Sequence, residues 1–265
     1  MNCVSDLFVW CLDIGCLNFG TFQHSTFIDT NLRLEHSRSH RILWLLEELN
    51  VSYELKTYKR NKQYRAGPEF DKLHPLGKSP VIEVFYENGD SKVLAETGHI
   101  INFIVSTYDT TGKLTPETEN DKLDADYYLH YAEGTLQPLL VSLLINTFAV
   151  KQAPFGTKFL VSKVVEALND SYYLSELKKN LAYLEGHMKK QHESGSEYFV
   201  GKKLSVADII LHFPMSNLFG DQNRLIGGSD PKELYPNLHK WAENTKTQKS
   251  LIKANELVRE LDTKL

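Results

Sequence analysis

The residue types and spacing that could do chemistry lie within residues 74–100, which read HPLGKSPVIEVFYENGDSKVLAETGHI. Ser79-Pro80 stands between a turn and an apolar run, and a proline that opens a strand gives up a ladder donor. A cis bond is predicted there, with ordinary trans proline as the alternative. Glu96-Thr97 then ends a strand and begins a helix, where backbone N–H groups attract anions. Together with Lys78, the segment suits a small zwitterionic peptide with a carboxylate at each end.

Hydrophobic periodicity predicts the elements that must position this segment. Apolar residues recur at helical spacing over 39–49, which indicates an amphipathic helix. Asn88-Gly89 between two apolar runs predicts a hairpin. Strands are expected at 32–34, 52–58, 80–86 and 92–95, a loop or distorted helix at 59–70, and a helix at 97–107. This order of strands and helices indicates a small α/β domain.

Beyond a turn-rich linker at 108–116, the chain is predicted to be helical throughout. Ser205 and Asp208 have the spacing of a capping box, so Asp208 is interpreted as structural rather than catalytic. The first helix should bend near Gly134 or Pro138, because an interior proline removes a helix hydrogen bond. Helices are expected at 119–149, 158–168, 171–191, from 205, and at 235–245 and 249–262. The predicted division is an extension at 1–30, one domain at 31–108 and a second at 117–265.

Composition excludes several classes of protein. A net charge of -4 and a pI of about 6.2 favour neither nucleic acid nor an anionic membrane as a partner. All three cysteines fall within residues 1–16, so a disulfide framework is not expected and the chain reads as intracellular. No zinc-type spacing is present, and no uninterrupted apolar run approaches the length of a membrane span. The apolar run at 7–12 lacks a basic flank, so a disordered or loosely packed extension is expected rather than a cleaved signal.

Five motifs in order resemble the glutathione S-transferase family, and the resemblance runs from about residue 31 to the C-terminus. They are EHSRSHRILWLLEEL, HPLGKSPV, AETG, LSVADI and YPNLHKW. The stretch YYLHYAEGTLQPLL is similar to the serine-type, endoplasmic-reticulum-associated fungal class. The resemblance implies a thioredoxin-like N-terminal domain that binds glutathione as co-substrate and an all-α C-terminal domain that walls an apolar pocket. It also implies a homodimer.

The resemblance implies that Ser37 is the catalytic hydroxyl. A thiol with a pKa near 8.5 is mostly protonated at neutral pH, and a hydroxyl donor beside a helix N-terminus would favour the thiolate. A shift of about two pKa units corresponds to about 2.7 kcal/mol. Ser39 is the alternative sulfur-facing hydroxyl, and either serine could instead cap the helix.

The same resemblance assigns the rest of the glutathione site. Ser79 and Pro80 would present backbone groups to the cysteinyl part, as a strand pairs with a peptide. Glu96 would meet the γ-glutamyl ammonium, and Thr97 the carboxylate beside it. Lys78 would pair with the glycyl carboxylate, with a solvated surface lysine as the alternative. Relatives usually have Val and Ser where this chain has Ser79 and Thr97, but the backbone and hydroxyl contacts are kept.

Three functions are compatible with this fold. The first is conjugation of glutathione to small, mostly apolar electrophiles, with glutathione-dependent peroxidase activity as an addition. The second is a non-catalytic binding or regulatory module, which fold alone does not exclude. The third, a cysteine-type thiol transferase, is disfavoured because residues 17–265 contain no cysteine. A cytoplasmic location is expected, with association to the endoplasmic reticulum membrane as an open alternative.

Overall fold

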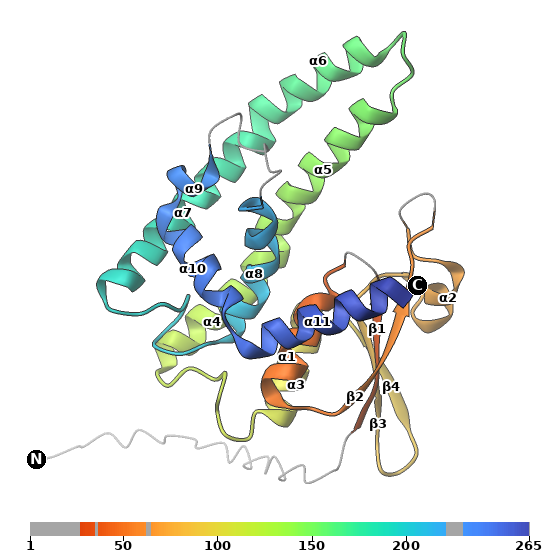
Figure 1. The fold of residues 1–265 in the computed structure, drawn as a ribbon, viewed down its shortest axis with the longest axis vertical. Helices are drawn as coiled ribbons and strands as arrows, with labels where there is room; N and C mark the ends of the chain where they lie inside the picture. The colour runs from red at the N-terminus through yellow and green to blue at the C-terminus, as the bar shows by residue number, and fades with distance from the viewer. Residues whose placement is uncertain (1–26, 35–36, 62–64, 221–229, 265) are drawn as a thin grey trace, which may run out of the picture.

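The computed structural model describes residues 27–34, 37–61, 65–220 and 230–264. These residues form a sheet-containing N-terminal lobe and a helical C-terminal lobe (Figure 1). Most of the extension predicted at residues 1–30 lies outside the described residues, and β1 begins at Phe27. The thioredoxin-like and all-helical organisation expected from the sequence is confirmed.

The N-terminal lobe is built on a four-stranded sheet with the order β2-β1-β3-β4. Its strands are β1 (Phe27–Leu34), β2 (Tyr53–Tyr58), β3 (Val81–Phe85) and β4 (Ser91–Ala95). β1 is parallel to β2, whereas β3 is antiparallel to both β1 and β4. The backbone pairs Leu34 with Tyr58 and Val81 with Ala95. The ends of β1, β2 and β4 and the start of β3 therefore meet at one edge.

Helices cover both faces of this sheet because apolar residues of β3 alternate between them. Ile82 and Val84 join the main core with α1 (Ser39–Leu49) and α3 (Thr97–Tyr108). Val81 instead joins a smaller cluster with Phe70 of α2 (Pro68–Leu73). The short helix α2 overlaps the end of the region 59–70 that was predicted to be loop or distorted helix, and extends three residues beyond it.

The described residues of the C-terminal lobe form helices joined by turns and loops, with no strand among them. Its elements are α4 (Glu119–Tyr131), η1 (Ala132–Leu136), α5 (Gln137–Gln152), α6 (Lys158–Leu168), η2 (Asn169–Tyr173), α7 (Leu174–Glu193), α8 (Val206–Leu218), α9 (Pro231–Leu234), α10 (Pro236–Lys246) and α11 (Lys249–Lys264). The bend predicted near Gly134 or Pro138 is a π-helical turn, η1, where the Gln137 N–H donates to the Ala132 carbonyl. Pro138 has no N–H to donate, which favours this irregular turn.

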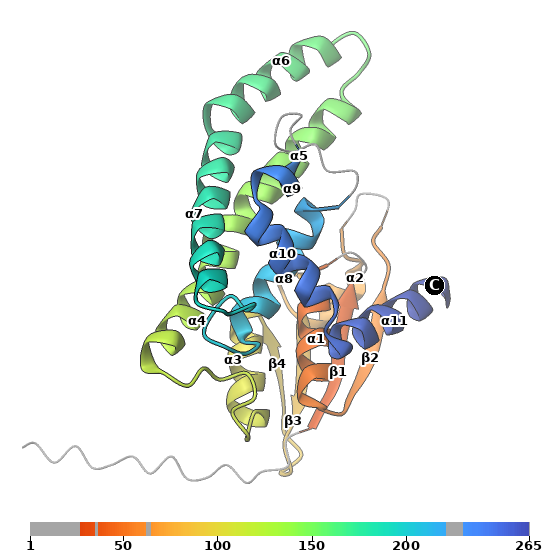
Figure 2. The same cartoon turned by 60° about the vertical axis from the view of Figure 1, so that its left-hand side comes forward.

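The C-terminal helix α11 returns to the N-terminal lobe and lies along α1 (Figure 2). The Trp44 Nε1–H donates to Ser250 Oγ at 2.9 Å, and His40 Nε2 is 2.7 Å from Asn255 Oδ1. Further along α11, Asp262 accepts two hydrogen bonds from the Arg33 guanidinium, at 2.7 and 3.0 Å. Side chains of α11 therefore bind the two elements, β1 and α1, that flank Ser37.

Candidate active site

The predicted site residues converge on one edge of the sheet. Ser37 lies between the end of β1 and the start of α1, and Ser79-Pro80 directly precedes β3. Glu96-Thr97 follows β4, whose last residue pairs with the first residue of β3. Segments 42 or more residues apart in sequence are thus neighbours because the strand register places their ends together.

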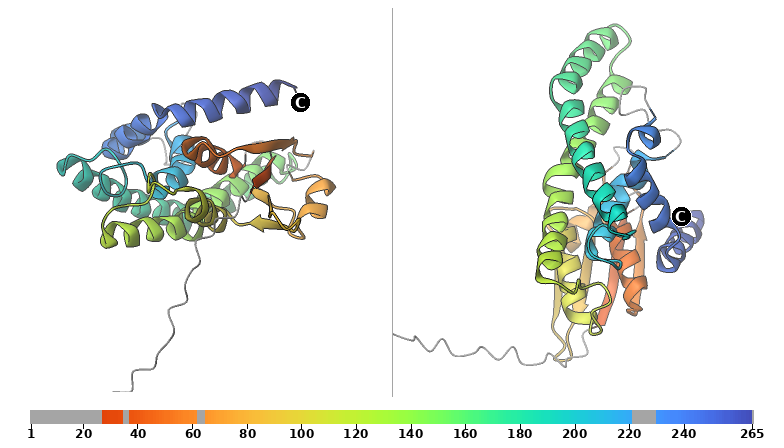
Figure 3. Two further views of the ribbon diagram at one scale, coloured as in Figure 1. Left: turned by 90° about the horizontal axis from the view of Figure 1, so that it is seen from below. Right: turned by 90° about the vertical axis from the view of Figure 1, so that its left-hand side faces the viewer.

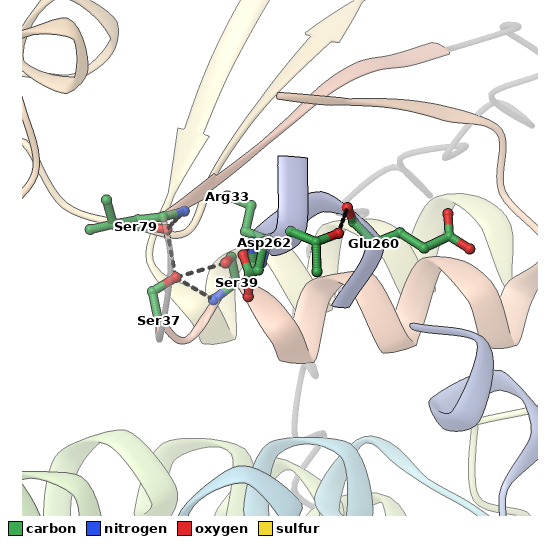
Figure 4. Close-up of polar contacts among 8 residues, drawn as sticks. Arg33, Ser37, Ser39, Ser79, Glu260 and Asp262 are labelled. Atoms are coloured by element: carbon green, nitrogen blue, oxygen red, sulfur yellow. Dashed lines mark hydrogen bonds and ion pairs between the residues drawn. The ribbon is translucent and has the colours of Figure 1, made fainter. Parts of the chain in front are cut away.

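Three serine hydroxyls form a connected cluster at this edge (Figure 4). Ser37 Oγ is 2.7 Å from Ser39 Oγ and 3.1 Å from Ser79 Oγ. The backbone N–H of Ser39 also donates to Ser37 Oγ, at 3.3 Å. Ser37 and Ser39 are buried and Ser79 is partly buried. The cluster lies at the N-terminus of α1, where the helix dipole favours negative charge.

The peptide bond between Ser79 and Pro80 is cis, as predicted. Pro80 is buried, and Ser79 Oγ accepts the Leu34 N–H at 3.4 Å. The side chain of Ser79 therefore joins the end of β1 to the start of β3. The family resemblance implied only a backbone role for Ser79. The structure shows in addition that its hydroxyl contacts Ser37.

The start of α3 offers an anion site beside the cluster. Glu96 is the N-cap residue, with φ 71° and ψ 122°, and its side chain makes no capping hydrogen bond. Its carboxylate is exposed, whereas the Thr97 side chain is buried. The first turn of α3 thus keeps N–H groups that an anion can accept from. Lys78 is exposed just before Ser79, so its ammonium can meet a ligand that approaches this edge.

A partly buried ion pair near the N-terminus of α1 joins the two lobes. Arg41 in the first turn of α1 is fully buried, and its guanidinium donates to the Glu133 carboxylate in η1. Glu133 Oε2 also lies 2.9 Å from Arg38 Nε. Burial lowers the pKa of Arg41 to about 10, although Glu133 opposes the shift, so the group stays cationic at neutral pH. Two guanidiniums face one carboxylate, which leaves excess positive charge near the serine cluster.

Two nitrogens of Arg41, Nε and Nη2, have no hydrogen-bond partner among the described residues. The ring of Phe213 in α8 lies under the guanidinium, 5.2 Å from ring centroid to Arg41 Cζ. Arg41 was not among the site residues predicted from the sequence. Arg41 stands beside Ile42 in a helix with an apolar face, and a charged side chain that is buried there needs a partner of opposite charge. This position was the available signal for the pair.

The aromatic residues of the C-terminal lobe fall into two groups, one in the core and one nearer the surface. Tyr128 and Phe219 are buried, and Tyr128 packs edge-on against Phe199. Tyr127 is 46% exposed and stacks on Tyr131. The ring of Phe213 contacts the guanidinium of Arg41, which lies in the first turn of α1.

The arrangement can bind a small anion and stabilise a second negative charge near Ser37. Helix N-termini of α1 and α3, together with the positive charge of the arginines, favour anions at this edge. Within the described residues, no group of three or more His, Cys, Asp or Glu side chains could hold a metal ion. The serine hydroxyls, the helix N-termini and the arginines can act on a bound ligand by hydrogen bonding and electrostatics.

Both halves of the chain match protein-family models. Residues 33–106 match "Glutathione S-transferase, N-terminal domain", and residues 157–254 match "Glutathione S-transferase, C-terminal domain". Among curated proteins, the chain is 35% identical to "Glutathione S-transferase 1" of Saccharomyces cerevisiae over 86% of this chain and 94% of that protein. It is 30% identical to "Glutathione S-transferase 3" of Schizosaccharomyces pombe over 78% of each.

Solved structures share the fold. A glutathione S-transferase from Actinobacillus pleuropneumoniae, 29% identical, superposes with a TM-score of 0.65 over 87% of this chain and 92% of that one. A glutathione transferase homolog from Lodderomyces elongisporus, crystallised with two GSH per subunit, gives 0.67 at 21% identity over 86% and 97%. Ure2p5 from Phanerochaete chrysosporium, cocrystallised with 1-(S-glutathionyl)-2,4-dinitrobenzene, gives 0.67 at 20% identity over 89% and 96%.

Proposed function

Because the chain belongs to the glutathione S-transferase family, we propose that it conjugates the thiol of glutathione to small, mostly apolar electrophiles. The observation that carries the proposal is the position of the Ser37 hydroxyl. It lies at the N-terminus of α1, on the sheet edge that also holds Ser79-Pro80 and Glu96-Thr97. One edge therefore offers groups for the peptide and a donor for its sulfur.

The peptide part of glutathione would bind along the start of β3 and the start of α3. The backbone of Ser79 would pair with the cysteinyl residue, as one strand pairs with another. The γ-glutamyl carboxylate would accept from the first turn of α3 and from the Thr97 hydroxyl, while Glu96 meets the ammonium. Lys78, which is exposed, would pair with the glycyl carboxylate. Together these contacts would hold the sulfur at this edge, beside the serine cluster.

The thiol would lose its proton to solvent, and the Ser37 hydroxyl would donate a hydrogen bond to the thiolate. The α1 dipole and the excess charge of Arg38 and Arg41 would favour the same anion. The thiolate sulfur then forms a bond to the electrophilic carbon, and that carbon releases its leaving group, chloride in the case of chlorodinitrobenzene. Phe213, on the C-terminal lobe, contacts the Arg41 guanidinium, and an apolar substrate would approach the thiolate from this lobe.

The test compares turnover of 1-chloro-2,4-dinitrobenzene by the wild type, Ser37→Ala and Ser39→Ala. Ser37→Ala should lose roughly tenfold or more in kcat/KM, since a hydrogen bond to a charged group contributes about 1.5–3 kcal/mol. Ser39→Ala should lose much less, because its hydroxyl supports Ser37 rather than the sulfur. Equal turnover by Ser37→Ala and the wild type would contradict the role of Ser37.

Calorimetry with glutathione separates conjugation from a non-catalytic binding module. Binding without turnover of several electrophiles would favour the module, and no binding at millimolar glutathione would contradict the site itself. The thiolate absorbance of bound glutathione, followed against pH, gives the pKa of the sulfur. In Ser37→Ala that pKa should rise while glutathione still binds, because the peptide contacts are unchanged.

A further inference from the structure

The α5–α6 hairpin ends in an exposed apolar surface that the proposed reaction does not use. We define the hairpin tip as residues 151–164, and it projects away from the rest of the molecule (Figures 1 and 3). Phe155 is 100% exposed, Phe159 71% and Leu160 64%. No residue of α6 is buried, and α6 packs mainly against α5 and η2. The described part of the chain therefore leaves this surface uncovered.

The turn at the tip holds Phe155 outward. The backbone N–H groups of Thr157 and Lys158 donate to the Pro154 carbonyl at 3.0 and 2.9 Å, and the Thr157 hydroxyl donates to it at 3.2 Å. These hydrogen bonds close the turn that contains Phe155, so the backbone that carries the exposed ring is ordered. A cluster of large apolar side chains at the end of a projecting element is typical of an interaction surface.

The charge of the tip differs in sign from that of the whole chain. Between Glu133 and Glu166 the sequence contains no Asp or Glu and three lysines, although the chain carries a net charge of -4. Lys151 and Lys158 are exposed on either side of the turn, and Lys163 pairs with Glu166 at 2.8 Å. The net charge of the whole chain does not favour an anionic membrane, but it averages over this local excess of positive charge.

We propose that the hairpin tip docks on the surface of an anionic lipid bilayer. Phe155, Phe159 and Leu160 would insert at the boundary between headgroups and acyl chains, as apolar residues of interfacial elements do. Lys151 and Lys158 would lie at the level of the lipid phosphates, with their aliphatic stems along the apolar region. The catalytic edge, at the far lobe of the molecule, would stay in water (Figure 2).

The proposed contact is docking of the hairpin tip on the bilayer surface, and no helix crosses the bilayer. The continuous helical run Glu119–Gln152 is long and apolar enough over 18 residues to cross a bilayer by length and composition, although polar residues interrupt it. However, Glu133 in this run binds Arg41, and Leu136 and Leu143 are buried in the core. Insertion of the whole run would break these contacts, whereas the tip can insert without disturbing them.

A tip-to-tip contact between two copies of the chain is less favourable than contact with a bilayer. Most homo-oligomers are symmetric, so a tip-to-tip contact would bring Lys151 and Lys158 of one copy against the same lysines of the other. Like charges that face each other oppose such a contact. An anionic lipid surface complements both the apolar and the basic side chains.

Flotation of the full chain with vesicles tests the proposal, using phosphatidylcholine alone or mixed with phosphatidylserine. The wild type should bind the anionic vesicles and not the neutral ones, and added salt should weaken binding. Phe155→Ser/Phe159→Ser and Lys151→Glu/Lys158→Glu should each lower vesicle partitioning about tenfold or more. Leu123→Ser, at an exposed leucine of α4 away from the tip, is the matched control and should bind like the wild type.

Turnover of chlorodinitrobenzene in solution checks that the tip variants are folded, because none of these residues lies at the serine cluster. The proposal is overturned if the wild type ignores anionic vesicles, or if binding persists in both tip variants. Sedimentation of the same proteins tests the other occupant. If Phe155→Ser/Phe159→Ser reduces the size of the wild-type assembly, the tip is a contact between copies, and the lipid assignment is wrong.

Discussion

The hydroxyl oxygens of Ser37 and Ser79 lie 3.1 Å apart, although 42 residues separate them in sequence. Ser37 Oγ also accepts the Ser39 N–H at 3.3 Å. If Ser79 donates to Ser37, both lone pairs of Ser37 are occupied and its own proton is left for another acceptor. Without a ligand that acceptor is Ser39 Oγ, at 2.7 Å. A bound sulfur could replace it.

Replacing Ser79 by alanine should therefore weaken the proposed reaction without abolishing it. The loss of one neutral hydrogen bond corresponds to about 1 kcal/mol, or roughly fivefold in kcat/KM. The pKa of glutathione bound to Ser79→Ala should rise, but less than in Ser37→Ala, because the donor nearest the sulfur remains. Thiolate absorbance against pH measures both shifts. Ser106→Ala, at an exposed serine of α3, is the control, and a wild-type pKa in Ser79→Ala would contradict the proton order described above.

The sequence predicted most of the scaffold because local patterns determine it. The helix expected at 39–49 is α1 with the same bounds, and Asn50 ends it in the left-handed region, with φ 52°. Gly89, with φ 86°, turns the hairpin between β3 and β4. Each of these signals lies within a few residues of the structure that it specifies.

What the sequence did not predict depends on contacts between distant segments. The Ser37–Ser79 contact follows from strand register, and the Arg41–Glu133 pair follows from how α1 packs on η1. Neither register across β1 and β3 nor the packing of lobes is encoded in a short motif. The bend at residues 132–136 was placed correctly, but its form, a π-helical turn, depends on how α4 and α5 pack against α8 and α7.

Removing the carboxylate of the inter-lobe ion pair should destabilise the protein strongly. Glu133→Gln leaves the buried Arg41 guanidinium without a counter-charge, and such a change costs about 3 kcal/mol or more. Glu166→Gln removes the same charge from a fully exposed pair with Lys163 and should have little effect. Urea unfolding of the two variants gives the free energies. Equal stability of Glu133→Gln and Glu166→Gln would show that the pair contributes little.

Asp208 should be required for stability and not for chemistry. Its carboxylate accepts from the Ser205 N–H and hydroxyl, the Phe199 N–H and the Trp241 Nε1–H, at 2.7–3.0 Å. The capping box predicted from the sequence is confirmed, and two of these donors, on Phe199 and Trp241, extend it. Burial raises the pKa of Asp208, and all four hydrogen bonds oppose the rise.

Asp208→Ala should lower the free energy of unfolding by about 3 kcal/mol or more, because several buried donors lose their acceptor. Activity per folded molecule should change little. Thermal melting and turnover, measured on the same samples, test both statements. Asp126→Ala, at an exposed aspartate of α4, is the control. An unchanged melting temperature in Asp208→Ala would refute the structural role, and lost turnover with normal melting would indicate a catalytic one.

His212 should make the protein less stable as the pH falls. Thr245 donates its hydroxyl proton to the Ala242 carbonyl, so its oxygen accepts from His212 Nδ1–H, at 2.7 Å. Nδ1 therefore carries a proton, and the state of the ring depends on Nε2. Burial lowers the pKa of His212 to about 3, and the positive charges of His40, Lys246 and Arg41 contribute to the same shift.

The unfolded chain binds a proton on His212 near its ordinary pKa of about 6.5, whereas the folded chain does not bind it until the pH approaches 3. The contribution of neutral His212 to the free energy of unfolding is thus fully present above pH 6.5, and it is lost as the pH falls toward 3. One such proton corresponds to a slope of about 1.4 kcal/mol per pH unit within that window. His212→Gln keeps a neutral donor for Thr245 and should remove this slope, whereas His130→Gln, at an exposed histidine of α4, should not. Urea unfolding at pH 4, 5, 6 and 7 measures it, and a slope that is the same in His212→Gln and the wild type would show that other groups carry the pH dependence.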